Sequence, residues 1–140
     1  MNTVFFEVRG SSAKRRALVE QAAEFCAERL TLGKAIININ ISGRRLEDDA
    51  YGYCDYVAKH NRFHHIDIEL YGKLDDAELL STLFHELKHA EQYCVGDLSP
   101  CVNVWKGKDY SESNAYMSLP WEVAARGFER RALNRWYASC

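Results

Sequence analysis

Apolar residues recur at helical spacing in three segments of the chain. In the first segment, Ser12–Leu32, they fall three or four residues apart and form one face of a helix. Ser11 or Ser12 can cap the start of this helix, and Gly33 is expected to end it. The segment therefore predicts a helix that packs one side against a core and exposes the other.

Two further helices follow in the second half of the chain. Asp75 and Glu78 form the acidic version of an N-terminal capping pattern, a wide apolar face follows them, and Gly96 closes the segment. A last helix begins near Pro120, because proline is tolerated in a first turn, and extends to about Trp136. The stretch between these two helices is rich in Gly, Pro, Asn and Ser and predicts irregular structure.

Strand-like patterns occupy the region between the first and second helices. They cover Ala35–Ile41, Tyr51–Ala58 and His64–Leu70, and the last alternates most clearly between aliphatic and acidic residues. The polar segment 42–49 predicts a loop. The order of elements indicates an α+β class, in which a small mixed or antiparallel sheet packs with the three helices.

Length and charge limit the possible functions. A chain of 140 residues suits a single domain, residues 1–140, and a hydrophobic content of 47% suffices for a core without cross-links. A formal net charge of −2 gives no electrostatic reason to expect nucleic-acid binding. One basic cluster occurs at helical spacing, and we interpret it as a solvated helix face. Its members are Arg126, Arg130, Arg131 and Arg135.

The sequence also favours a cytoplasmic protein. Its first ten residues lack the basic and then apolar pattern of a secretory signal, and no apolar run is long enough to cross a membrane. The cysteines are odd in number, scattered and never in a CxxC pair, which is typical of reduced thiols. Cys94 and Cys101 lie close together in sequence, and we interpret them as two separate thiols.

The chemistry of the chain centres on residues 85–89, HELKH, inside the second predicted helix. His85 and His89 lie one turn apart on the same face, so both imidazoles can reach one metal ion. Glu86 is rotated by about 100° from His85, which makes it a poor third ligand but lets it reach a water bound to that ion. Two neutral nitrogen ligands beside a carboxylate base are typical of a hydrolytic zinc site.

A catalytic zinc site needs a third protein ligand and an open fourth position. The remaining histidines, His60, His64 and His65, all precede the motif, in or near a strand. Glu122 in the first turn of the last helix is the better candidate, because the 32 residues between it and His89 can fold that helix back onto the second. The alternative is an ordinary first-turn carboxylate, which the helix dipole favours.

These segments resemble the gluzincin group of zinc metallopeptidases, which combine HExxH with a glutamate from a following helix. Residues 83–92 and 119–128 are similar to small stand-alone domains of phages and mobile elements, and to regulatory peptidases of the ImmA/IrrE type. In the second segment, Glu122, Ala125 and Phe128 match a Glu-x-x-Ala-x-x-Phe pattern.

The resemblance implies a zincin-like fold, with one Zn²⁺ ion bound by His85, His89 and Glu122 and with Glu86 as the general base. It also implies a protein or peptide substrate, which would pair as an extended strand with His64–Leu70 or its neighbour. A phage-encoded or bacterial protein in the host cytoplasm would fit this group.

One position departs from the family pattern. Many gluzincins carry an acidic residue four positions after the ligand glutamate, where it orients a histidine, and here Arg126 stands in that place. We therefore expect Asp97 or a backbone carbonyl to take over this role. Tyr110 and Tyr116 are candidates for stabilising a developing oxyanion, although aromatic residues in such a loop more often serve packing.

Three functional hypotheses follow. The position of Glu86 between two histidines predicts an endopeptidase. The small size of the chain suits an alternative, a zinc-binding regulatory domain that sequesters a partner without turnover. A purely structural metal site is the third hypothesis, and it would leave no coordination position for water.

Overall fold

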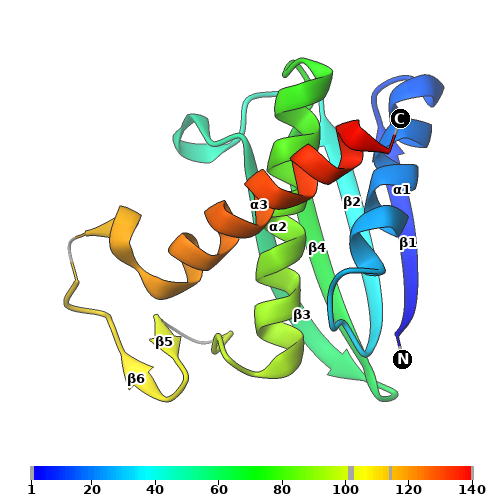
Figure 1. The fold of residues 1–140 in the computed structure, drawn as a ribbon. Coiled ribbons are helices and arrows are strands. Elements are labelled where there is room, and N and C mark those ends of the chain that lie inside the picture. Colours follow the sequence, from blue (N-terminus) through cyan, green and yellow to red (C-terminus); the bar gives the residue numbers. More distant parts are fainter. Residues whose placement is uncertain (1, 101–102, 114, 140) are drawn as a thin grey trace.

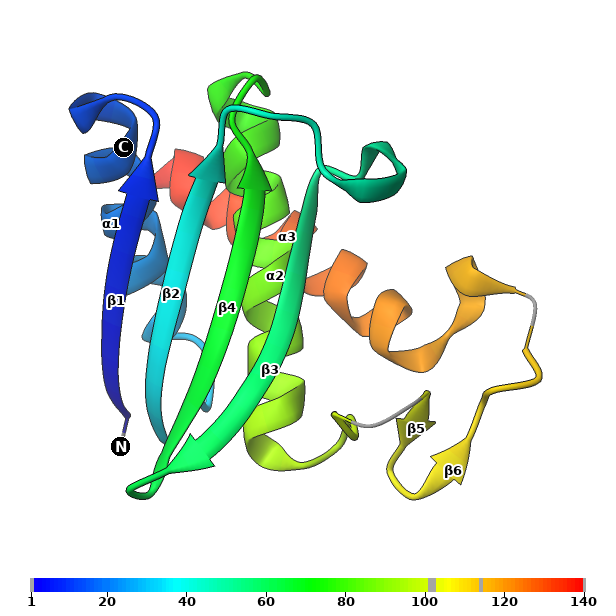
Figure 2. The same cartoon turned by 180° about the vertical axis from the view of Figure 1, so that it is seen from behind.

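A four-stranded mixed sheet carries three long helices on one of its faces (Figures 1 and 2). The computed structural model describes residues 2–100, 103–113 and 115–139. Its strands are β1 (Thr3–Gly10), β2 (Lys34–Ser42), β3 (Gly52–His60), β4 (Phe63–Tyr71), β5 (Val104–Trp105) and β6 (Lys108–Asp109). Its helices are α1 (Ala13–Ala27), α2 (Asp76–Val95) and α3 (Pro120–Ala138), with 3-10 turns at Glu47–Asp49 and Tyr116–Ser118. The predicted α+β class with a small mixed sheet is confirmed.

The strand order of the main sheet is β1-β2-β4-β3. β1, β2 and β4 run parallel, whereas β3 runs antiparallel to β4 and forms the outer edge of the sheet. The sequence pattern did not predict β1. Its alternation is blurred because Phe5 and Phe6 are adjacent large apolar residues, one 58% exposed and the other packed against the core.

The first helix starts as predicted and ends earlier. The Ser12 hydroxyl accepts a hydrogen bond from the Arg15 N–H at 3.2 Å, which confirms Ser12 as the cap. The prediction that Gly33 ends this helix is wrong, because α1 ends at Ala27 and the chain then turns inward. The Asn2 side chain donates hydrogen bonds to the carbonyls of Ala27 and Leu30, at 3.0 and 2.7 Å, and so satisfies groups that a longer helix would have paired.

The core lies between the sheet and the two helices α1 and α2. The central strands supply the aliphatic layer and α2 supplies the facing layer, and each such side chain contributes about 1.5–3 kcal/mol by its burial. α2 begins at the predicted cap, where Asp75 accepts from the Glu78 N–H at 2.8 Å, and ends at Gly96 with a φ of +85°. The largest buried residues of these layers are Ile37, Ile39, Ile41, Ile66, Ile68, Leu70, Leu79, Leu83, Phe84 and Leu87.

α3 crosses over α2 and ends beside α1 (Figure 1). Ala125 and Ala132 are buried in the crossing, and their small side chains let the two helix axes approach closely. At the end of α3, the ring of Trp136 packs edge-on against Phe25 of α1, with centroids 5.3 Å apart. These contacts fix the direction of α3 and thereby the position of its first turn over α2.

The prediction of a cytoplasmic protein used the cysteines and the lack of a membrane-crossing apolar run, and the structure describes both features. Cys26, Cys54 and Cys94 are free thiols, while Cys101 and Cys140 lie outside the described residues. Within the described ranges, none of the helices combines the length and apolarity that a bilayer-spanning segment requires.

Candidate metal centre

Three side chains from two helices converge on one point. His85 and His89 lie on the same face of α2, with ring centroids 4.9 Å apart. Glu122 in the first turn of α3 contacts both. Its Oε1 lies 3.0 Å from Nε2 of His85, and its Oε2 lies 3.2 Å from Nε2 of His89. The donor atoms of the three residues all lie within 4.8 Å of one another, so the group could hold a metal ion.

The first turn of α3 is placed by its neighbours. Pro120 stands at the first helical position, and Trp121 packs on Trp105 and Tyr110 with ring centroids 6.4 and 5.7 Å away. The segment between α2 and α3 thus returns the chain so that Glu122, which is only 5% exposed, faces the two histidines. The structure brings together the three residues that the sequence proposed as ligands.

A buried amide holds the ring of His89. Nδ1 of His89 lies 2.7 Å from Oε1 of Gln92, and Nε2 of Gln92 donates to the carbonyl of Trp121 at 3.0 Å. Because the Trp121 carbonyl can only accept, the amide nitrogen must face it, and the amide oxygen must face the imidazole. Nδ1 of His89 therefore carries a proton, and in the neutral ring the lone pair lies on Nε2, toward Glu122.

A carboxylate holds the ring of His85 in the same way. Nδ1 of His85 lies 2.8 Å from Oε1 of Glu129, and the other oxygen of Glu129 accepts from the Ser81 hydroxyl. The neutral ring then also presents its lone pair from Nε2. Such partners fix the tautomer of a metal-binding histidine and raise its basicity.

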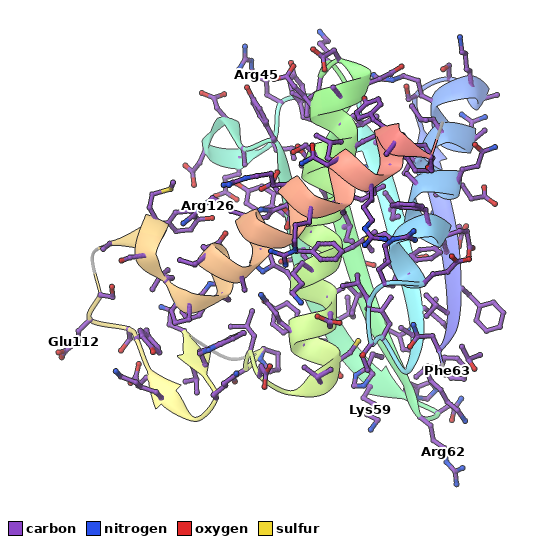
Figure 3. All side chains as sticks on the ribbon, in the orientation of Figure 1. Arg45, Lys59, Arg62, Phe63, Glu112 and Arg126 are labelled. Atoms are coloured by element: carbon purple, nitrogen blue, oxygen red, sulfur yellow. The ribbon has the colours of Figure 1, made fainter. Side chains whose placement is uncertain are left out.

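The expectation that Asp97 or a backbone carbonyl orients a ligand histidine is wrong, because Glu129 and Gln92 hold the two rings. Glu129 follows Glu122 by seven residues, which is two helical turns, so it lies on the same face of α3. Arg126 points away from the site. Its side chain extends toward the Tyr116–Ser118 turn (Figure 3) and donates a hydrogen bond to the carbonyl of Met117.

Glu86 lies beside this group without joining it. The residue is 7% exposed, and its side chain packs near Gly52 of β3. A Cβ at Gly52 would lie 2.6 Å from Cγ2 of Thr82 and 3.3 Å from Cγ of Glu86, so the glycine makes room for the carboxylate. Burial raises the pKa of Glu86 to about 7, against the opposing effect of the two histidines.

The pKa shifts of His85, His89 and Glu122 indicate that the carboxylates of this group attract positive charge. Burial alone would lower the pKa of His85, but its hydrogen bonds to Glu122 and Glu129 outweigh burial and raise that pKa to about 10. The pKa of His89 is raised too: burial again opposes the change, and the Glu122 carboxylate outweighs it. Burial would raise the pKa of Glu122, yet its hydrogen bonds to the histidines lower it to about 2. Without a metal, Glu122 favours protons on the Nε2 atoms that face it, and a bound cation would take the place of those protons.

Two cavities open next to the group. One of about 210 Å³ is lined by His85, Glu86, His89 and Glu122, together with residues of β3. A larger one of about 630 Å³ adjoins His85 and Glu86 and is bounded by residues of the β3 start, α2 and α3. Tyr116 lines both cavities.

The two tyrosines singled out in the sequence differ in position. Tyr110 packs edge-on against Trp121, with an interplanar angle of 88°, and serves packing. Tyr116 as a whole residue is 61% exposed, but partial burial of its phenol together with the nearby Glu122 carboxylate raises its pKa to about 12. Only Tyr116 of this pair therefore lies where it could contact a bound molecule.

The strand order decides where an extended peptide could pair. His64–Leu70 belongs to β4, which lies between β2 and β3, so of the two predicted alternatives this strand has no free edge and its neighbour remains. Its neighbour β3 is one of the two edge strands, the other being β1, and no other strand in the described part of the chain pairs with the outer side of β3. β3 also carries Gly52, which adjoins Glu86 and both cavities.

Comparisons with known proteins add no relative, since no family model, curated protein or solved structure matches this chain. The resemblance to gluzincins therefore stays a prediction based on residues 83–92 and 119–128.

Proposed function

We propose that this protein is a zinc-dependent metallopeptidase in which His85, His89 and Glu122 hold one zinc ion and Glu86 acts as the general base. One observation carries the proposal. The three donors converge from two helices, while the buried Glu86 carboxylate lies beside them and stays outside the donor set.

The donor set fits zinc. Two imidazole nitrogens and one carboxylate oxygen are a common set for catalytic zinc, which keeps a further position for water or substrate. Both Nδ1 atoms are engaged by Gln92 and Glu129, so both Nε2 atoms are available as ligands. A zinc ion bound by these residues would supply a Lewis acid that polarises a carbonyl group and makes water more acidic.

Residues of the chain would then carry out proton transfer, stabilise the oxyanion and orient the imidazoles. Glu86 accepts a proton from the attacking water and returns it to the leaving amine of the cleaved peptide bond. Tyr116 lines both cavities. Its hydroxyl donates a hydrogen bond to the carbonyl oxygen of the substrate as negative charge develops there. Glu129 and Gln92 keep the imidazoles oriented throughout.

An unfolded protein segment or peptide suits the surroundings of the site. The outer edge of β3 can add an extended strand through backbone hydrogen bonds. The cavity of about 630 Å³ next to His85 could take one side chain of that strand, and its walls include Ala50, Ala77 and Leu133.

The test compares the parent with Glu86→Gln, with the exposed Glu20→Gln on α1 as a matched control. Each protein is loaded with zinc, its zinc content is measured, and cleavage of a peptide library is followed by mass spectrometry. We expect equal zinc content, parent-like cleavage by Glu20→Gln, and a loss of at least about 100-fold in Glu86→Gln.

Cleavage by Glu86→Gln at the parental rate would contradict the proposal. If the parent instead formed a stoichiometric complex that survives Glu86→Gln and never turns over, the chain would be a zinc-binding sequestering domain.

A further inference from the structure

A second pocket lies between α1, α2 and α3, separate from the metal centre. It has a volume of about 490 Å³, and none of the residues that line it also lines the two cavities beside His85. Four of its six lining residues are cationic, although the chain as a whole has a net charge of −2. We call this the basic pocket; it is lined by Arg29, Lys88, Phe128, Arg131, Ala132 and Arg135.

Two of these cations already have partners. Lys88 forms an ion pair with Glu91, which also accepts a hydrogen bond from the Thr31 N–H at 2.7 Å. The Arg29 guanidinium lies 3.6 Å above the ring of Phe25 and donates to the carbonyl of the same residue. These contacts hold both side chains in place at the pocket.

The other two cations lack such partners. Arg131 and Arg135 lie one turn apart on α3, and among the described residues neither guanidinium has an ion pair or a hydrogen bond. Like charges at this spacing repel one another and weaken a helix slightly. Both residues belong, with Arg126 and Arg130, to the basic cluster whose helical spacing predicts a solvated helix face. Arg126, however, turns toward Met117, and Arg130 does not line the pocket.

We propose that the basic pocket binds a phosphate monoester. The two unpaired guanidiniums supply two positive charges, which match the dianion of such a group, and each can donate two parallel hydrogen bonds to its oxygens. The volume exceeds that of a bare phosphate and lies in the range of small-molecule sites. Phe128 and Ala132 give the pocket an apolar wall for the organic part of the ligand. The positive charges gather around one pocket with six lining residues rather than along an extended basic stripe, which favours a single phosphate over a nucleic-acid backbone.

The phosphate could belong to a free nucleotide or to a phosphorylated side chain of a protein, and the test separates these sources. The protein is first treated with EDTA, so that phosphate cannot bind through a metal at His85. Inorganic phosphate, adenosine monophosphate and a phosphoserine peptide are then titrated separately, with binding followed by NMR shifts of the α3 amides. Adenosine and the unphosphorylated peptide serve as ligand controls.

We expect saturable binding of at least one phosphate monoester. Arg131→Gln and Arg135→Gln should each weaken this binding by at least about tenfold, whereas Arg130→Gln on the same helix should leave it unchanged. Tighter binding of the nucleotide or of the phosphopeptide would identify the source, and equal binding of all three would assign recognition to the phosphate alone. All three residues are exposed, so the variants should fold, which the unperturbed amide spectrum of the sheet would verify.

The proposal is overturned if no phosphate compound binds saturably, or if Arg130→Gln weakens binding as much as the other two variants. Binding that persists in both Arg131→Gln and Arg135→Gln would overturn it as well. The measurement uses metal-free protein and no peptidase assay, so its result is independent of the proposed function.

Discussion

Replacement of Gln92 by leucine tests how the metal centre is held. Gln92 is 2% exposed and joins the two helices of the site, because its oxygen faces Nδ1 of His89 and its nitrogen donates to the carbonyl of Trp121. Leucine has a similar size but no polar atom. Gln92→Leu therefore leaves a buried N–H of His89 without an acceptor and releases the ring from its orientation.

The structure sets the size of the two effects. A buried polar group that loses its partner costs about 1–3 kcal/mol of folding free energy. Partners of ligand histidines typically contribute about 10- to 100-fold to metal affinity, which corresponds to about 1.4–2.8 kcal/mol. We expect losses of these sizes in Gln92→Leu, with little change in the matched variant Gln21→Leu, whose side chain is exposed on α1.

Urea unfolding in EDTA measures the first effect, and competition for zinc with a chromophoric chelator measures the second. The reasoning is refuted if Gln92→Leu binds zinc as tightly as the parent. A variant that loses stability but not affinity would show that Gln92 supports the helix crossing and leaves the ligand ring unaffected.

Three further predictions follow, two from the candidate metal centre and one from the sheet. Glu129→Gln should weaken zinc binding by about 10- to 100-fold, since the carboxylate that holds Nδ1 of His85 is lost, and unchanged affinity in the chelator assay would contradict this role. Because the metal-free pKa of His85 is raised to about 10, this ring is protonated at pH 7 and zinc must displace its proton, while the raised pKa of His89 adds to the proton release. Zinc affinity should thus rise with pH, and calorimetry in buffers of different ionisation enthalpy counts the protons; a count of zero would refute the assignment. Gly10→Ala should cost about 2–4 kcal/mol of stability in urea unfolding, because φ is +87° and the new Cβ would lie 2.1 Å from the carbonyl oxygen of Ile41. Gly33→Ala, with a φ of +61° and no atom within 4 Å, should cost only about 1–2 kcal/mol, and equal losses would contradict the steric argument.

Local periodicity was sufficient for the helices and for three of the four main strands. Ser12, Asp75 and Gly96 were recognisable because capping depends on neighbouring backbone groups. The end of α1 was missed, because it depends on Asn2, which is distant in sequence but bonded to the last turn. β1 was missed for a different reason, since the adjacent Phe5 and Phe6 blur the alternation of its apolar and polar positions.

The candidate metal centre could likewise be predicted only in part from local spacing. His85, Glu86 and His89 follow from the spacing of one helix, whereas the approach of Glu122 depends on how α3 crosses α2. Glu129 had a usable signal, its seven-residue distance from Glu122 along one helix face. Spacing alone did not show which face points inward.

The strand order could not be predicted from the pattern of the strands. β3 and β4 form a hairpin, and either could have been at the edge until the partner of the other was known. β2 joins β4, so the edge beside the metal centre falls to β3. Of the two predicted alternatives for the substrate-pairing strand, this order leaves the neighbour that carries Gly52.

Anomalous X-ray diffraction at the zinc edge, from crystals grown with zinc, would locate a bound ion and its ligands. We expect one strong peak between α2 and α3, about 2.0–2.2 Å from Nε2 of His85, Nε2 of His89 and a carboxylate oxygen of Glu122. The Glu86 carboxylate should remain outside this ligand shell. A peak ligated by Glu86, a fully protein-ligated ion with no open position, or no peak among these residues would contradict the proposed catalytic zinc site.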